Sequence, residues 1–247
     1  VCGVMRRRWS EEGNPVFVLP WCLVLGSAGS GKTTLIENSD LRLPIDHEIR
    51  SAISDLKETQ AARFAEWRVA GSDAVLIEIT GGFSVGQEER TPIQTLLWRC
   101  FLAQLQVVRP RRPLNGVVLT IDIVDFAEME ASARDAFATR IRRILDDIVE
   151  SLATRMTIHV VFTKIDQIAG FLDFFHDIEA AEREALLGFQ FTVEGEQPWV
   201  EQFDTQYSEF LERLHGFLAL RMKSLKDMHR RQDAFTFVRS FAGIQKA

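Results

Sequence analysis

The sequence predicts an α/β fold with a mostly parallel sheet, and three observations lead to this prediction. Short apolar runs of strand length recur along the chain, at Trp21 to Leu25, Ala74 to Ile79, Leu114 to Ile123 and Thr157 to Phe162. Segments with helical spacing separate most of them, and the first run leads directly into a glycine-rich loop. Buried strands that alternate with helices are typical of three layers, with helices on both faces of a parallel sheet.

The glycine-rich loop reads G-S-A-G-S-G-K-T and fits the phosphate-binding pattern G-x-x-x-x-G-K-[ST], which indicates a P-loop NTPase fold. Its glycines let successive backbone amides form an anion nest, and a helix from Lys32 to Asn38 would present its positive end to the phosphates. Lys32 is expected to reach the β- and γ-phosphates as the catalytic charge, and the Thr33 hydroxyl to bind Mg²⁺. The predicted nucleotide-binding residues are Gly26, Ser27, Ala28, Gly29, Ser30, Gly31, Lys32, Thr33 and Thr34.

Composition excludes several other classes of protein. The net charge of -6 over 247 residues gives no general attraction for nucleic acid, so no nucleic-acid partner is expected. The three cysteines and five histidines show no zinc-site spacing, which favours a reducing compartment. No apolar run approaches the roughly 20 residues that span a bilayer. Since the chain does not begin with Met, we expect it to be a piece of a longer protein.

The second apolar run, Ala74 to Ile79, is predicted to form a hairpin with Trp67 to Ala70 and to carry part of the metal site. It holds Glu78 near its end, and Gly81 follows in T-G-G. A carboxylate there would hold Mg²⁺ through water, and the Gly81 amide would meet the γ-phosphate. Glu78 is therefore a predicted metal residue and Gly81 a predicted catalytic one.

A hydroxyl from the polar stretch Ile49 to Phe64 would complete the Mg²⁺ shell in a nucleotide switch. Thr59 is the candidate metal ligand, with Ser51 and Ser54 as alternatives.

Two helices are expected around the third strand. Thr91 and Pro92 carry N-cap and first-turn signals for a helix that continues to Val108. An amphipathic helix is predicted over Glu128 to Arg155, with a solvated basic face of Arg140, Arg142 and Arg143. Its expected apolar stripe is Ala133, Phe137, Ile141, Ile144, Leu145, Ile148 and Leu152.

The fourth strand runs into Thr163-Lys164-Ile165-Asp166, which fits the guanine-reading pattern [NT]-K-x-D. The Asp166 carboxylate would accept from guanine N1–H and the exocyclic amine, while the Lys164 stem lies over the ring. Thr163, Lys164 and Asp166 are thus predicted to bind the base of GTP. ATP remains an open alternative, because base specificity rests on this tetrapeptide.

The C-terminal part is predicted to be mostly helical. Two short helices over Phe171 to Leu187 and a strand over Phe189 to Val193 precede helices at Val200 to Lys223 and Asp227 to Ile244. The predicted organisation is a lead-in over residues 1–18, a P-loop domain over 19–198 and a helical extension over 199–247.

Four sequence blocks resemble the cytoplasmic NTPase domain of the TssM/IcmF family. They are L-P-W-C-L-V-L-G-S-A-G-S-G-K-T-T-L-I-E-N-S from Leu19, R-P-L-N-G-V-V-L-T from Arg112, V-F-T-K-I-D from Val161 and A-G-F-L-D-F-F from Ala169. R-R-Q-D-A-F-T-F from Arg230 is a weaker match.

The resemblance implies an inner-membrane core subunit of a type VI secretion machine, or the related type IV accessory factor. In that family the domain lies between transmembrane helices, which this fragment lacks, and faces the cytoplasm. Its implied partners are other membrane-complex and baseplate subunits. Arg6, Arg7 and Arg8 would follow a membrane helix, as the positive-inside tendency predicts.

One departure from the family pattern predicts slow or absent hydrolysis. Where the family has D-T-A-G-R-Y, this chain has E-I-T-G-G-F from Glu78, and Gly82 cannot orient an attacking water. Two functions therefore stay open. One is a Mg²⁺-dependent GTP or ATP domain with weak hydrolysis coupled to secretion-complex assembly. The other is a nucleotide-independent scaffold that uses the fold for docking. A free-standing signalling GTPase is disfavoured by the family blocks.

Overall fold

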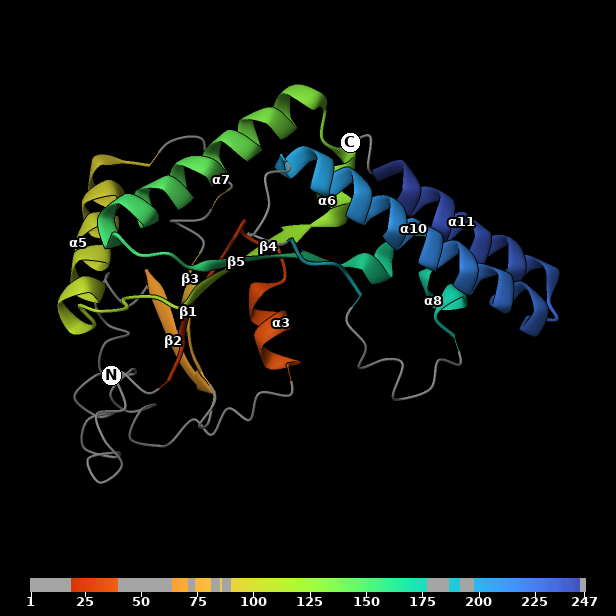
Figure 1. Cartoon of the computed structure of the whole chain (residues 1–247), viewed down its shortest axis with the longest axis horizontal. Helices are drawn as coiled ribbons and strands as arrows, with labels where there is room; N and C mark the ends of the chain where they lie inside the picture. The colour runs from red at the N-terminus through yellow and green to blue at the C-terminus, as the bar shows by residue number, and fades with distance from the viewer. Residues whose placement is uncertain are drawn as a thin grey trace. The chain divides into compact units, whose positions relative to one another are not determined.

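The computed structural model describes residues 19–39, 64–70, 74–80, 85, 90–176, 187–191 and 198–244 (Figure 1). The chain divides into two compact units, Val1–Thr163 and Lys164–Ala247. The sequence predicts a boundary at residue 198, whereas the compact units divide directly after the last strand.

The first unit contains a five-stranded sheet in the order β2-β3-β1-β4-β5 (Figure 1). Strands β1, β3, β4 and β5 run parallel, and β2 pairs antiparallel with β3 as the predicted hairpin. The mostly parallel α/β sheet predicted from the sequence is confirmed. The strands are β1 Trp21–Gly26, β2 Ala65–Ala70, β3 Ala74–Ile79, β4 Gly116–Asp122 and β5 Thr157–Thr163.

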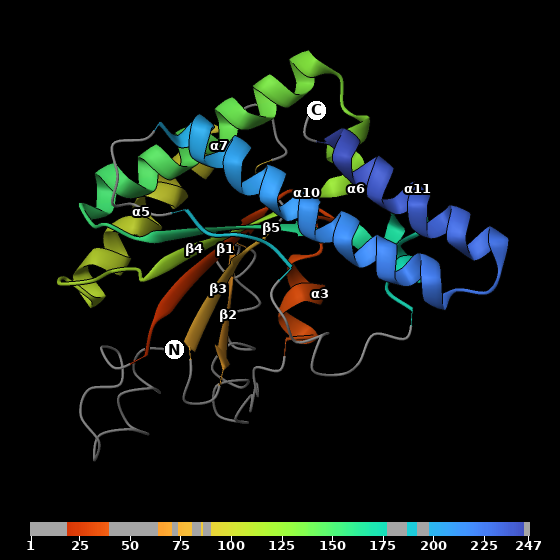
Figure 2. The ribbon, with the colours of Figure 1, turned by 45° about the vertical axis from the view of Figure 1, so that its right-hand side comes forward.

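Helices cover both faces of this sheet. Trp21, Leu23 and Leu25 of β1 pack in the main core with helices α5 (Pro92–Val108) and α7 (Ala131–Leu152). Val24 faces the other way and packs with Ile36 of α3 (Lys32–Glu37). The alternation follows the two-residue period of a strand, so α7 and α3 lie on opposite sides of the sheet (Figure 2).

The start of α5 agrees with its sequence signals. The Thr91 side chain accepts from the Gln94 amide, and the Gln94 side chain accepts from the Thr91 amide, which completes a capping box. Between β4 and α7 lies a helix that the sequence analysis missed, α6 (Ile123–Glu128), capped by the Asp122 carboxylate. Because Ile123 begins this helix, β4 is shorter than the strand predicted over Leu114 to Ile123.

Helix α7 confirms most of its predicted apolar stripe. Phe137, Ile144, Ile148 and Leu152 are buried, whereas Ala133 is exposed. Arg142 and Arg143 are exposed as expected.

The prediction for Arg140 is wrong. Its side chain is half-buried, and its Nε donates to the Val85 carbonyl oxygen at 3.1 Å. A backbone acceptor within reach draws this arginine inward despite its position on the polar side of the sequence pattern.

The second unit is mostly helical in the residues described. It contains a short 3-10 helix, η3 (Ile165–Gln167), then α8 (Phe171–Phe174), and the long helices α10 (Trp199–Ser224) and α11 (Met228–Ile244). Helices α10 and α11 lie side by side (Figures 1 and 2). The hydroxyl of buried Tyr207 donates to the Phe241 carbonyl oxygen at 2.8 Å, which ties the pair together. No described helix is long and apolar enough to traverse a bilayer.

The strand predicted over Phe189 to Val193 is wrong for residues 189–191, which form no strand. Phe189 instead packs its ring on Phe203 and Tyr207 of α10, with centroids 5.9 and 6.4 Å apart. Burial against a helix satisfies the apolar pattern that suggested a strand. Residues 192–193 lie outside the described part of the chain.

Two glycines of the second unit give stability predictions of opposite sign. A Cβ at Gly170 would overlap the Asp233 carbonyl oxygen, and the φ of Gly170, +83°, is left-handed. Gly216 lies in α10, and no atom lies within 4 Å of the position that a Cβ would take there. We expect Gly170→Ala to destabilise the protein by about 2 kcal/mol or more. Gly216→Ala should stabilise it by about 0.5–1 kcal/mol.

Urea unfolding of both variants and the wild type measures this difference. Equal midpoints for the two variants would contradict the close approach of α8 and α11 at Gly170.

Candidate phosphate-binding site

The loop from Gly26 to Thr33 lies at the carboxyl edge of the parallel strands. The loop follows β1, which lies between β3 and β4. The strands that follow β1 in the chain are added first on the β3 side and then on the β4 side, so β1 is a topological switch point. Ligands of open α/β sheets bind in the crevice at such a switch point. The predicted loop is therefore at the position where this architecture places a ligand.

Glycines are required at three positions of the loop. Gly29 and Gly31 have φ angles of +76° and +77°, which are costly for residues with a Cβ. A Cβ at Gly26 would overlap the Thr120 side chain and lie 2.7 Å from the Thr120 carbonyl oxygen. The loop therefore combines left-handed backbone with close contact to β4.

Hydroxyl groups on β4 and β5 hold the loop in place through hydrogen bonds. Thr120 of β4 is fully buried and its hydroxyl donates to the Leu25 carbonyl oxygen at 3.2 Å. Because that uses its single proton, Ser30 donates to Thr120 Oγ1, at 2.7 Å. Thr163, at the end of β5, donates to the Ser30 carbonyl oxygen at 2.9 Å. Thr163, which the sequence assigns to base binding, here braces the loop.

Thr120 is a site residue that the sequence analysis missed. A hydroxyl inside the apolar run V-V-L-T-I-D was the available signal, because a buried hydroxyl needs a hydrogen-bond partner.

The loop keeps several amide donors without an acceptor. The Ser30 amide donates to the Ser27 carbonyl oxygen at 3.1 Å, which closes the turn. Among the described residues, the amides of Gly31, Lys32 and Thr33 have no hydrogen-bond acceptor. Ala28, Gly29 and Thr33 of the loop, and Thr34 directly after it, are exposed. These donors fit an anion, which would supply the acceptors that the described part of the chain does not.

Lys32 is buried, with 6% of its surface exposed. Its ammonium donates to the carbonyl oxygens of Gly26 at 2.9 Å and Ser27 at 2.7 Å. Burial lowers the pKa of Lys32, and the charge of Glu78 opposes this shift. The predicted phosphate-binding cation is thus held on the carbonyls of its own loop.

Thr33 and Glu78 are brought together as the sequence predicts for a metal site. The Thr33 hydroxyl donates to Glu78 Oε1 at 2.7 Å, and Glu78 is 4% exposed. A hydroxyl that gives its proton to a carboxylate keeps its lone pairs for a cation. Arg68 of β2, which the sequence analysis did not single out, lies 3.5 Å from Glu78 Oε2.

The other predicted site residues fall outside the described residues or in the second unit. Gly81 and Thr59, together with the alternatives Ser51 and Ser54, are outside the described residues. Lys164 and Asp166 belong to the second unit: Lys164 has a left-handed φ of 57°, and Asp166 lies in η3. Within the described residues no cluster of three or more His, Cys, Asp or Glu side chains is suited to a metal ion.

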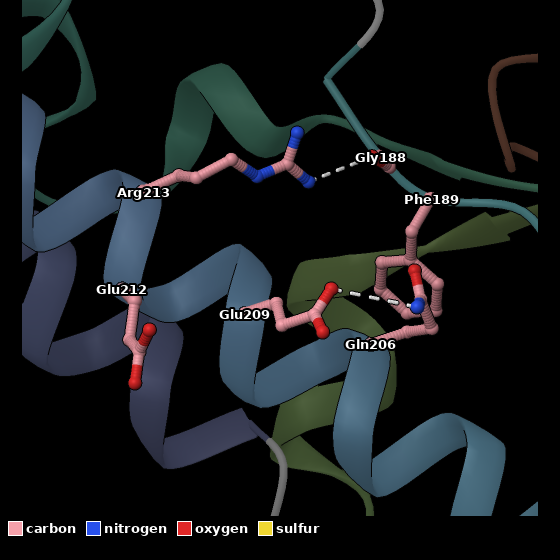
Figure 3. Close-up of a pocket in the computed structure, with 6 residues that line it drawn as sticks. All are labelled: Gly188, Phe189, Gln206, Glu209, Glu212 and Arg213. Atoms are coloured by element: carbon pink, nitrogen blue, oxygen red, sulfur yellow. Dashed lines mark hydrogen bonds between the residues drawn. The ribbon is translucent and has the colours of Figure 1, made fainter.

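An open hollow of about 610 Å³ lies in the second unit, between α10 and residues 187–191 (Figure 3). Arg213 donates to the Gly188 carbonyl oxygen there at 3.2 Å, and Glu209 and Glu212 contribute acidic side chains. Because two carboxylates would repel a phosphate, this hollow is unsuited to a nucleoside triphosphate.

Comparison with known proteins identifies the family. The model of the IcmF-related N-terminal domain matches residues 94–247. This chain belongs to that family. The type VI secretion system component TssM1 of Pseudomonas aeruginosa is 29% identical over 241 residues, which is 96% of this chain and 21% of the relative. This IcmF-related chain therefore spans about a fifth of the length of that relative. No solved structure matches it.

The lowered pKa of Lys32 predicts how stability varies with pH. Below the folded-state pKa, Lys32 is protonated in both states and the cost of its burial is fully present. As pH rises from there toward the ordinary value of 10.5, the native state releases the proton first and gains stability relative to the unfolded state.

Unfolding free energies of wild type and Lys32→Met, compared across alkaline pH, measure this effect. The wild type should gain stability relative to the variant as pH rises. A constant difference would contradict the lowered pKa.

Proposed function

We propose that this chain is the nucleotide-binding domain of a type VI secretion subunit, taking GTP or ATP with Mg²⁺ and hydrolysing it slowly. The observation that carries the proposal is the combination, on one loop, of amides without an acceptor among the described residues, a buried lysine and a hydroxyl bonded to a buried carboxylate. In the sequence, the same loop fits a pattern of nucleotide-binding proteins.

Phosphate binding would be the work of the loop backbone and Lys32. The amides of Gly31, Lys32 and Thr33 would donate to phosphate oxygens, which would satisfy donors that have no acceptor within the described residues. Lys32 would exchange the two loop carbonyls for phosphate, gaining a charged acceptor in place of neutral ones.

The metal would be held by the Thr33 hydroxyl and, in the outer shell, by Glu78. When bound, Mg²⁺ neutralises phosphate charge as it builds up during transfer. The 2.7 Å hydrogen bond from Thr33 to Glu78 already aligns the Thr33 oxygen with a buried carboxylate.

Slow turnover is supported by what the chain lacks in sequence. The residue directly after Gly81 is not a glutamine, and Gly82 has no side chain to orient an attacking water. Positioning and charge stabilisation carry most of phosphoryl-transfer catalysis, so binding would survive where turnover is weak.

The choice of base remains a prediction from the sequence. Lys164 and Asp166 follow Thr163 in the chain, and the T-K-I-D pattern favours GTP over ATP.

The family and the match to TssM1 support a place in a type VI secretion assembly. We propose that the domain works at the cytoplasmic face of the bacterial inner membrane, attached through transmembrane helices of the longer protein. Its partners there would be other membrane-complex and baseplate subunits, and nucleotide binding would be coupled to their assembly.

One observation favours the second function, a nucleotide-independent scaffold. The charges of the site already have partners: Lys32 is held by Gly26 and Ser27, and Glu78 by Thr33 and Arg68. A loop stabilised in this way could persist as a docking surface without a ligand.

Equilibrium titration with fluorescent GTP and ATP analogues, with and without Mg²⁺, separates the two functions. Saturable binding to the wild type is expected, weakened at least about tenfold in Lys32→Met because a charge-assisted contact worth roughly 1.5–3 kcal/mol is lost. Arg142→Met removes the same charge at an exposed position of the same unit and should bind like the wild type. Absence of binding to the wild type would leave the scaffold function.

The base prediction has its own test. Asp166→Asn should shift preference from guanine toward xanthine nucleotides, because an amide can donate where the carboxylate only accepted. Competition with GTP and XTP against the fluorescent analogue measures the shift, and an unchanged order of affinity would refute guanine reading.

A further inference from the structure

Arg68 lies among three carboxylates from three elements of the first unit. Its guanidinium is 3.2 Å from Glu66 Oε2 on β2, 3.4 Å from Glu37 Oε1 at the end of α3 and 3.5 Å from Glu78 Oε2 on β3. Glu66 and Glu78 are direct register partners across the hairpin. Since like charges directly opposite each other are destabilising, Arg68 offsets a repulsion built into the strand pairing.

The three carboxylates differ in how much they depend on Arg68. The side chains of Glu37 and Glu66 are 59% and 40% exposed and have water as an alternative partner, whereas that of Glu78 is 5% exposed. Glu78 Oε1 accepts from Thr33, but buried Oε2 accepts no hydrogen bond within the described part of the chain. At 3.5 Å, Arg68 balances the charge of Glu78 without filling the hydrogen-bonding capacity of Oε2.

We propose that Arg68 competes with the divalent cation for Glu78, and so sets the cation concentration that the site requires. The identity of the cation site rests on the proposed function. In the ligand-free protein Arg68 balances the buried carboxylate. When a cation takes that role, Arg68 is repelled and is retained by Glu66 and Glu37, which already lie within reach.

Arg68 is a positioning residue in this proposal, because it acts through its contact with Glu78. Its contact with Glu37 links the hairpin to α3, the helix that begins at Lys32. Occupation of the cation site would therefore change the contacts between these two elements.

Thermal unfolding of the whole chain at increasing Mg²⁺, without nucleotide, tests the competition. Arg68→Met removes the competing charge and keeps much of the side-chain volume. The Mg²⁺ concentration for half-maximal stabilisation should fall at least about fivefold, the lower end of typical coupling between sites. Arg142→Met, with the same change of charge at an 85% exposed side chain, should leave it unchanged.

A second variant tests the opposite direction and does not depend on the folding of Arg68→Met. Glu37→Gln with Glu66→Gln alters two exposed side chains and leaves Glu78 as the one carboxylate in contact with Arg68 among the described residues, so the required Mg²⁺ concentration should rise. In a protein that already carries Glu78→Gln, adding Arg68→Met should no longer change the response to Mg²⁺, because the contested carboxylate is absent.

The competition is overturned if the required Mg²⁺ concentration is unchanged or higher in folded Arg68→Met, or unchanged or lower in the double glutamine variant. Absence of any Mg²⁺ effect in these proteins also overturns it. The nucleotide titration is read separately. If the required Mg²⁺ concentration falls in Arg68→Met and rises in the double glutamine variant but no nucleotide binds, this inference stands and the proposed function is rejected. If nucleotide binds but the required Mg²⁺ concentration is the same in all variants, the proposed function stands and this inference is rejected.

Discussion

The close approach of the loop backbone to β4 is the constraint on which the site depends. Because Gly26 lacks a Cβ, the chain can leave β1 directly against Thr120. The Ser30 and Thr120 hydroxyls, 2.7 Å apart, then fix the loop to the sheet. Fixing the loop in turn places Lys32 and Thr33 at the switch point of the parallel strands, where a buried carboxylate on β3 is within reach.

The fixed position of the loop also determines how the buried charges of the site are balanced. Lys32 and Glu78 are both buried, and each has partners from the protein itself. A buried charge without a partner is very costly, so a loop that binds and releases phosphate, as proposed, would need partners in both states. The carbonyls of Gly26 and Ser27 provide them for Lys32, and Arg68 provides one for Glu78.

The sequence was sufficient for the elements whose signals are local. The strand, loop and helix around Gly26 to Thr33 follow from glycine spacing and an apolar run, and the capping box fixes the start of α5. Sequence analysis failed where a residue distant in the chain determines the position of a side chain. Arg140 turns inward to donate to the Val85 carbonyl oxygen, and Phe189 packs on α10. Arg68 could have been found, because pairing Ala70 with Ala74 sets a register that places Arg68 diagonally from Glu78.

The central claim is that the loop holds a polyphosphate and that Lys32 changes partners to bind it. A crystal structure of the wild-type protein with Mg²⁺ and a non-hydrolysable GTP analogue tests this most directly. We expect the β- and γ-phosphates within the loop, with Lys32 Nζ on their oxygens and no longer on Gly26 and Ser27. A loop without nucleotide, with Lys32 still on both carbonyls at saturating ligand, would contradict it.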